Sequence, residues 1–385
     1  MTPTTWDIVI VGGGPAGASA AIAALHAEPS ASVLVLDRSD FPRDKCCGDA
    51  VLEGALDELA AHGVPQGRLM DGYAPSNVLT LQSAAGRSVT RILPRSMLIV
   101  PREVFDARLL AEARALGAVF RRHTVRQVRD RGSHVEVDDI ANARVCIGAD
   151  GVESAVRRAV GDGGRRDIAV AIRGYDSSAG EPASRIVLNH HSGMAYAWRF
   201  PTTSGPANVG YGHLLRPGES ANRRLLLSTM HALLPGLDVD PHTVRAHRLP
   251  LSSSRPVTAR GRIVLAGDAA SLVNPVSGEG ISYAISSGLA AGAAAVLEPN
   301  RVAAQYRTAL RRRFARHHRH VTLLAGLTGW RAVVDAALSA AAGSQRVFDD
   351  IAELSLAEGV ITPRLAANLV LSLGRRGVVR GTGDG

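Results

Sequence analysis

Apolar residues near the start of the chain form short runs, and each run ends where small or polar residues begin. Residues 7–11 are almost all β-branched, which is typical of a strand buried on both faces. A glycine-rich turn follows at 12–17, and the alanine-rich stretch 18–26 has the composition of a buried helix. A second apolar run, 33–36, stops at Asp37. This order predicts a strand–helix–strand unit with parallel strands.

Two later apolar runs have the same form. Residues 145–149 lead into Asp150, and residues 262–267 lead into Asp268. An Ala/Gly-rich segment at 281–296 then has the length and composition of a long buried helix. These segments predict that one parallel sheet is assembled from distant stretches of the chain.

Between these segments, apolar and polar positions alternate in short runs separated by turn residues, which predicts a mixed or antiparallel sheet. After residue 299 the pattern is helical. The predicted fold class is therefore α/β, with a Rossmann-like nucleotide-binding domain, a mixed-sheet substrate domain and a helical C-terminal region. The expected ranges are 1–75, 100–165 and 257–298 for the nucleotide domain, 76–99 and 166–256 for the substrate domain, and 299–385 for the helical region.

Composition and charge indicate in which compartment the protein works and which classes of partner it can bind. The hydrophobic content of 46% and charged content of 21% are those of an ordinary globular protein. Three Cys, two of them adjacent, cannot form a disulfide framework, so we expect a reducing, cytoplasmic location. The net charge of +9 lies mostly after residue 300, in a segment that includes the basic run 311–319. We expect no nucleic-acid partner, because aromatic content is 4% and no nucleic-acid module is recognisable.

The glycine-rich turn has the spacing G-x-G-x-x-G, which is typical of a dinucleotide site when it lies between a strand and a helix. Gly12 permits the tight turn, Gly14 allows a pyrophosphate to approach the backbone, and Gly17 lets helix and strand pack closely. The helix that begins near Pro15 and Ala16 offers free N–H groups to phosphates.

Asp37, 20 residues beyond the last glycine of the motif, is placed to hold ribose hydroxyls, with Arg38 beside it. A plain turn at the end of the strand is the other interpretation of this pair.

Three motifs in order resemble a known superfamily. They are G-x-G-x-x-G, then A-D-G-x-x-S-x-x-R around Asp150, then G-D-A-A followed by P-x-x-G-E-G. The last two contain Gly267, Asp268, Pro275, Gly278, Glu279, Gly280 and Ile281. Together they resemble the FAD-dependent fold typified by p-hydroxybenzoate hydroxylase, within the glutathione reductase type of FAD-binding domain.

This resemblance implies that the nucleotide is FAD and that Asp268 contacts its ribityl chain. It also implies that the turn at 278–280 and the helix after it present N–H groups to the flavin, where a helix N-terminus favours negative charge. Arg102 would lie beside the cofactor at the start of a helix, unless it is an ordinary surface charge.

The segment Phe41-Pro42-Arg43-Asp44-Lys45-Cys46-Cys47-Gly48-Asp49 resembles the geranylgeranyl reductase branch of this superfamily. So does the stretch that contains Trp198 and Phe200, which we expect to line the substrate pocket. Lys45 is the only lysine in the chain. With Arg43 and Cys46 it is expected on the cofactor side. The branch often has Gly-Gly after the Cys, whereas this chain has Gly48-Asp49.

Cys47 and Gly48 are the candidate catalytic residues. A thiol beside Lys45 and near the start of the helix expected at 50–61 would tend toward thiolate. Cys47 then has three possible roles, which are to donate a proton, to shape the pocket, or to exchange redox equivalents with Cys46.

The resemblance implies an FAD-dependent reductase that transfers hydride from flavin N5 to a C=C bond of an apolar isoprenoid, lipid or natural product. The alternatives are a monooxygenase, or a halogenase, that uses a C4a-hydroperoxyflavin on an aromatic or polyketide substrate. A flavin-bearing, lipid-associated binding protein is a further alternative. The electron donor would be transient NAD(P)H or a protein. No metal site is expected, and the basic C-terminal helix is a candidate for peripheral membrane contact.

Overall fold

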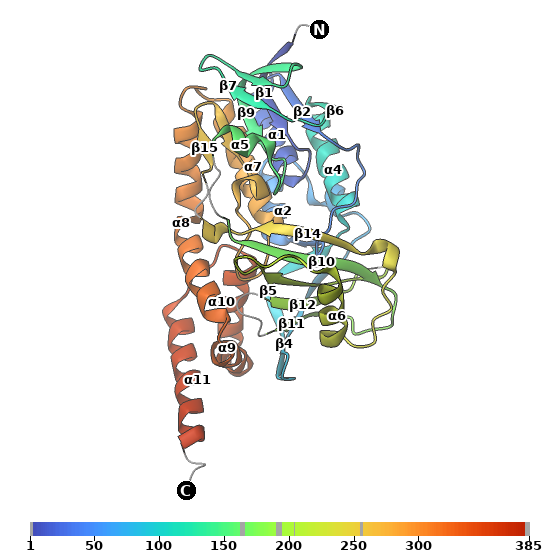
Figure 1. Cartoon of the computed structure of the whole chain (residues 1–385), viewed down its shortest axis with the longest axis vertical. Helices are drawn as coiled ribbons and strands as arrows, with labels where there is room; N and C mark the ends of the chain where they lie inside the picture. Colours follow the sequence, from blue (N-terminus) through green and yellow to red (C-terminus); the bar gives the residue numbers. More distant parts are fainter. Residues whose placement is uncertain (1–2, 162–165, 190–194, 204, 255–256, 382–385) are drawn as a thin grey trace.

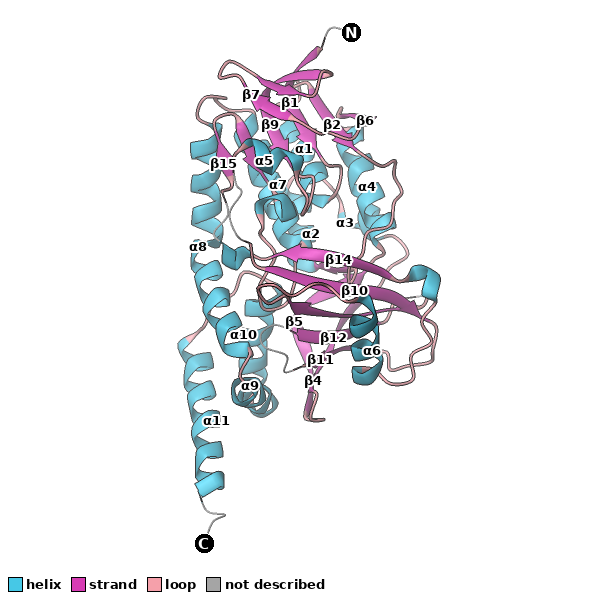
Figure 2. Cartoon of the chain, viewed as in Figure 1, coloured by secondary structure: helices cyan, strands magenta, loops and turns pink. Residues whose placement is uncertain are grey.

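The computed structural model describes all residues except 1–2, 162–165, 190–194, 204, 255–256 and 382–385. Figure 1 shows two sheets that follow one another along the long axis, with a column of C-terminal helices beside them. The nucleotide motifs belong to the first sheet and the predicted substrate domain forms the second. Figure 2 shows that helices cover the first sheet, whereas the second faces the C-terminal helices.

The first sheet is parallel at its centre, as the buried apolar runs predict. The strand order is β15-β16-β9-β1-β2-β6, and only β15 runs antiparallel to its neighbour on this path. The short strands β7 and β8 form a hairpin that extends from β9. The strands are β1 (Thr4–Val11), β2 (Val33–Asp37), β6 (Val119–Arg122), β7 (Val128–Asp130), β8 (Val135–Val137), β9 (Ala141–Gly148), β15 (Ala259–Arg260) and β16 (Ile263–Leu265).

Helices α1 and α7 pack against each other unusually closely, and glycines make this possible. A Cβ on Gly288 would lie 2.2 Å from the Ala16 carbonyl oxygen, and one on Gly292 would lie 2.0 Å from that of Ala20. This contact explains the Ala/Gly-rich composition of α7, and it brings the N-termini of two helices to one region of the molecule. The helices of this half are α1 (Pro15–Ala27), α2 (Glu53–Ala61), α3 (Gln66–Met70), α4 (Arg102–Ala115), α5 (Ala155–Ala159) and α7 (Ile281–Ala295).

The second sheet is mixed, with the order β14-β10-β13-β12-β11-β4-β5-β3. Only β11 and β4 pair in parallel. Its strands are β3 (Ala50–Leu52), β4 (Pro75–Ser83), β5 (Ser88–Ile99), β10 (Ile168–Asp176), β11 (Ser184–Leu188), β12 (Ala195–Phe200), β13 (Ala207–Leu214) and β14 (Arg245–Pro250). Helix α6 (Arg223–Leu233) covers one face, and 3₁₀ turns lie at Pro241–Thr243, Ser252–Ser254 and Gly267–Ala270.

One predicted element differs. Residues 50–61 were expected to be a single helix within the nucleotide domain. In the structure, residues 50–52 form β3, which pairs with β5 of the second sheet, and the helix begins only at Glu53. The loop at 44–49 therefore crosses between the two sheets.

The C-terminal region is helical, and it consists of α8 (Val302–Thr328), α9 (Arg331–Gly343), α10 (Gln345–Leu356) and α11 (Pro363–Gly381). Helix α8 runs along both halves of the molecule, and α9 and α10 pack on β4 and β5. No single helix among the described residues is long and apolar enough to cross a membrane. Helices α8 and α9 pass such a test only together, and they meet at a bend of 115°.

Candidate active site

The turn after β1 can accept a dinucleotide because two of its glycines cannot carry side chains. Gly12 has a φ of +105°, and a Cβ there would lie 2.2 Å from the Ala149 carbonyl oxygen. A Cβ on Gly17 would lie 1.8 Å from the Gly12 carbonyl oxygen. No side chain caps α1 at Gly14, so its first N–H groups remain available to phosphates.

Asp37 at the end of β2 is buried beside this turn. Its Oδ2 accepts a hydrogen bond of 2.8 Å from the Gly13 N–H, and its Oδ1 accepts one of 3.0 Å from Ser39. Asp37 therefore shapes the strand-end turn, yet a carboxylate has further lone pairs for ribose hydroxyls. Arg43 lies between two acids, 3.9 Å from Asp37 and 3.4 Å from Asp106.

Arg102 is a buried charge at the start of α4, with only 4% of its surface exposed, so the surface interpretation was wrong. Its Nε and Nη2 donate to both carboxylate oxygens of Asp106, at 2.7 and 2.8 Å. Burial alone would lower the pKa of Arg102, but Asp106 outweighs it and raises that pKa. The pair places a fixed cation against the Cys47 thiol.

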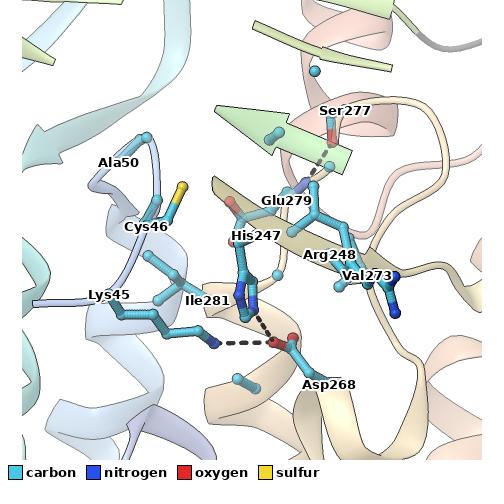
Figure 3. A pocket seen from close by; sticks show the side chains of 18 of the residues that line it. Lys45, Cys46, Ala50, His247, Arg248, Asp268, Val273, Ser277, Glu279 and Ile281 are labelled. Atoms are coloured by element: carbon cyan, nitrogen blue, oxygen red, sulfur yellow. Dashed lines mark hydrogen bonds and ion pairs between the residues drawn. The ribbon is translucent and has the colours of Figure 1, made fainter. Parts of the chain in front are cut away.

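Lys45 forms an ion pair with Asp268 across the cavity. Figure 3 shows its Nζ pointing at Asp268, at 3.0 Å, with His247 approaching the same carboxylate oxygen at 3.9 Å. Burial alone would raise the pKa of Asp268, but Lys45 and His247 outweigh it and hold that pKa well below its usual range. Asp268 is therefore a carboxylate at neutral pH, available to accept hydrogen bonds from hydroxyls.

The turn before α7 differs from the expectation in one detail. The Glu279 carboxylate accepts a 2.7 Å hydrogen bond from the Ser282 N–H, so part of the helix N-terminus is capped from within the chain. Burial raises the pKa of Glu279, and the hydrogen bond to Ser282 only partly opposes this. Asp150 acts similarly, because it accepts from the Ala155 N–H at 2.7 Å at the start of α5. Burial raises its pKa as well.

The expectation of a reactive thiolate was wrong. The helix starts at Glu53, so Cys47 does not lie at its N-terminus. Burial raises the pKa of the Cys47 thiol, and the Arg102 guanidinium only partly opposes this. Burial also raises the pKa of Cys46 to about 12, and its thiol donates to the Arg245 carbonyl. Neither Cys46 nor Cys47 forms a disulfide. Because its pKa is raised, the Cys47 thiol keeps its proton at neutral pH.

These groups line one end of a cavity of about 1040 Å³ that continues into the second sheet and the C-terminal helices. All predicted site residues line it except Gly17, Gly267 and Pro275. Gly267 (φ +58°) packs closely on Ala16 and Ala284. The other end of the cavity, which we call the apolar arm, is lined mainly by apolar side chains. Its lining includes Leu79, Leu81, Met97, Ile186, Trp198, Phe200, Leu324, Val333, Ala337, Leu338, Phe348, Ile351 and Leu369.

Sequence reasoning missed several residues that shape this cavity. Tyr196 lines it near the Glu279 turn and donates a hydrogen bond to the Ser277 carbonyl, and burial raises its pKa. Asn208 and His247 come from β13 and β14. Tyr196 and Asn208 both lie in stretches that resemble the family, Tyr196-Ala197-Trp198 and Ala207-Asn208-Val209, but neither side chain was singled out as a site residue.

The residues present fit FAD. The glycine turn has no room for side chains at Gly12 and Gly17, acids end β2 and follow β16, and the cations Arg43 and Lys45 line the same cavity. The same cavity continues from these groups into a part lined by apolar side chains.

Comparisons with known proteins agree. Residues 5–210 match the family described as FAD binding domain. A menaquinone reductase of Mycolicibacterium smegmatis is 33% identical over 315 residues, which cover 74% of this chain and 75% of that protein. A digeranylgeranylglycerophospholipid reductase of Methanopyrus kandleri is 30% identical, over 76% of this chain and 80% of the relative. The chain belongs to the geranylgeranyl reductase family.

This membership confirms the predicted FAD cofactor and the assignment as an FAD-dependent oxidoreductase. Solved structures confirm the fold class. A geranylgeranyl bacteriochlorophyll reductase-like protein of Thermoplasma acidophilum superposes with a TM-score of 0.74, at 21% identity and 96% coverage of both chains. A flavin-dependent brominase superposes with a TM-score of 0.68 at 16% identity, over 97% of this chain and all of that one, which shows a shared fold alone.

Proposed function

We propose that this reductase saturates a C=C bond in the isoprenoid chain of a quinone or lipid. The observation that carries the proposal is the apolar arm that leads out of the FAD site. Helices α8–α11 contribute 14 of the described lining residues, and none of them is charged. An extended hydrocarbon chain buried there gains roughly 0.8 kcal/mol per CH₂.

A prenylated quinone fits this arm better than a charged phospholipid does. Among the lining residues of α8–α11, the only polar side chains are those of Thr328 and Ser355. A phosphate would find no cation in this part of the cavity, whereas a quinone ring needs few polar partners. The menaquinone reductase among the relatives supports the same choice.

When bound, FAD supplies the hydride for such a reduction. The chain must supply the proton, and two groups that line the cavity hold one at neutral pH. These are the thiol of Cys47 and the phenol of Tyr196, because burial raises the pKa of each. The arm itself excludes water from the carbon that receives the proton.

Halogenation is disfavoured by the electrostatics of the site. The halogenase chemistry considered above uses a lysine in the substrate tunnel, and the only lysine here is Lys45. Its ammonium is paired with Asp268 at the cofactor end of the cavity. The apolar arm therefore has no lysine of its own.

The proposed reaction is tested by the rate at which the reduced enzyme is reoxidised. The enzyme is reduced chemically without oxygen and then mixed with a prenylated menaquinone, with a prenyl glycerophospholipid or with air. We expect recovery of the oxidised flavin absorbance to be fastest with the quinone and slow in air, with two hydrogens gained in the prenyl chain of the quinone and not only at its ring. Fast recovery in air with oxygen consumption, and no response to either alkene, would favour a monooxygenase.

We also propose a cytoplasmic enzyme that docks on a membrane, and the basic run at 311–319 is one candidate surface for this contact. Within that run, Arg313 is engaged with Glu58 and Glu358, at 2.5 and 2.6 Å. The bend between α8 and α9 offers a better surface. Leu323 and Leu327 lie one turn apart on α8, and Trp330 follows at the bend before α9; 60%, 38% and 67% of their surfaces are exposed.

Other residues of the same bend, Leu324, Thr328 and Val333, line the cavity. Arg331 follows Trp330 and pairs with Asp335 at 3.9 Å, but its side chain stays exposed enough to meet anionic headgroups as well. A lipid bilayer at this bend would place the apolar arm next to its hydrocarbon layer.

Substitution of Leu327 and Trp330 by Ser should weaken binding to phosphatidylglycerol vesicles about 10-fold, because it removes exposed apolar area from the interface. Co-sedimentation measures this. Leu225→Ser on α6 is the matched control, since Leu225 is 47% exposed on the other side of the molecule. The outcome that would contradict this is wild-type binding by the double variant together with loss of binding when Arg311 and Arg312 are changed to Gln. The basic run would then be the docking surface.

A further inference from the structure

Asp49 occupies a position that is unfavourable for an aspartate in three ways. Its φ is +61°, a left-handed conformation that suits glycine. Its side chain is fully buried, and burial raises the pKa of its carboxyl to about 6. Its Oδ1 has no hydrogen-bond partner. Costs of this kind persist at sites where they serve function.

The other oxygen of Asp49 anchors the crossing loop to the second sheet. Oδ2 accepts a 2.6 Å hydrogen bond from the Tyr175 hydroxyl of β10 and a 2.8 Å hydrogen bond from the Asn208 amide of β13. The same amide nitrogen donates to the Cys47 carbonyl at 2.9 Å. Asn208 Oδ1 accepts from the Trp198 indole at 2.7 Å. Both hydrogens of the amide and its oxygen are therefore used.

These bonds hold the loop at 44–49 against β10 and β13 of the second sheet. Gly48 lies between the two anchored residues, and a Cβ on it would lie 3.3 Å from the Phe200 ring and 3.5 Å from the Trp198 indole nitrogen. The loop thus fits closely against the substrate side of the cavity. A shift of this backbone would move Cys47 and Gly48 together.

We propose that Asp49 is a positioning residue, whose carboxylate oxygen holds the Cys47–Gly48 wall of the active site against Asn208 and Tyr175. The cavity does not include Asp49 itself, so it acts through the loop and not on substrate. This inference requires the FAD site but not the reduction of any particular alkene.

The test follows the accessibility of the Cys47 thiol in the FAD-bound protein, in a Cys46→Ala background. Cys146 is fully buried and does not interfere. Asp49→Gly removes the anchor and keeps the backbone conformation, so alkylation of Cys47 by N-ethylmaleimide should become about 10-fold faster while FAD stays bound. The visible band of bound FAD should shift. Asp49→Asn keeps an acceptor oxygen and should restore the wild-type rate and spectrum.

The matched control is Asp138→Gly, because Asp138 also has a positive φ, of 44°, and does not line the cavity. It should leave the alkylation rate unchanged. A wild-type rate in Asp49→Gly would overturn the proposal, and so would an Asp49→Asn variant that reacts as fast as Asp49→Gly.

Stability distinguishes this role from a merely structural one. Because the carboxyl pKa is raised in the folded state, ionisation of Asp49 costs stability as pH rises through about 6. Arg173 and Tyr175 of β10, Asn208 of β13, Arg102 of α4 and the neighbouring Cys47 face this group. Asp49→Asn should therefore melt at a higher temperature than wild type at pH 8, with little difference at pH 4. A lower melting temperature at pH 8 would mean that Asp49 stabilises the fold, and would contradict the proposal.

Discussion

Gly17→Ala should weaken FAD binding about 100-fold and give a nearly colourless protein. The added methyl group would need a place 1.8 Å from the Gly12 carbonyl oxygen and 3.2 Å from Ile10. Both neighbours are buried, so either the turn or the start of α1 must move. Such a shift displaces the N–H groups that face the pyrophosphate. Titration of the FAD-free protein with FAD, followed by fluorescence, measures the effect.

Gly67→Ala is the matched control, because a Cβ at this exposed helical position would meet nothing within 4 Å. It should bind FAD as the wild type does. Circular dichroism establishes that both variants are folded. Wild-type affinity in a folded Gly17→Ala protein would mean that the turn after β1 is not the dinucleotide site.

Ala337→Trp should lower kcat/KM for a long prenyl substrate about 50-fold, because the indole fills the apolar arm that we assign to the isoprenoid chain. Ala337 lies on α9 and lines that arm. The FAD site is remote from it, so FAD affinity should not change. A substrate with a short prenyl chain, which does not reach α9, should be reduced at the normal rate.

The control for this substitution is Ala342→Trp, at an exposed position near the end of the same helix that does not line the cavity. It carries the same bulk without entering the arm. An equal loss with long and short substrates would indicate general disruption of the site. An unchanged rate with the long substrate would mean that the isoprenoid chain does not occupy this arm.

Local patterns predicted much of the first sheet and its cofactor turn. The continuous apolar runs at β1, β2, β9 and β16 allow few alternatives to a parallel sheet, and G-x-G-x-x-G has a backbone requirement that glycine alone meets. These patterns alone indicated a dinucleotide; FAD was implied by the resemblance to the superfamily, and the comparisons confirmed both FAD and the fold class. The lone Lys45 was placed on the cofactor side, although its partner Asp268 lies 223 residues away and could not be identified.

The sequence was least informative where distant segments determine the environment of a residue. Cys47 has a lysine beside it in sequence, yet the burial imposed by distant strands and helices decides its pKa. Asp49 was noticed only as a departure from Gly-Gly, because its partners Tyr175 and Asn208 are 126 and 159 residues away. The ion pairs of Arg313 with Glu58 and Glu358 likewise depend on tertiary packing.

We propose that this FAD-dependent oxidoreductase reduces an isolated C=C bond. The most direct measurement is a single turnover of chemically reduced enzyme with a prenylated menaquinone in the absence of oxygen, followed by mass spectrometry of the extracted quinone. We predict a product that has gained two hydrogens in its prenyl chain, in an amount that matches the flavin oxidised. Flavin that stays reduced, with the quinone and a prenyl lipid recovered unchanged, would contradict the account.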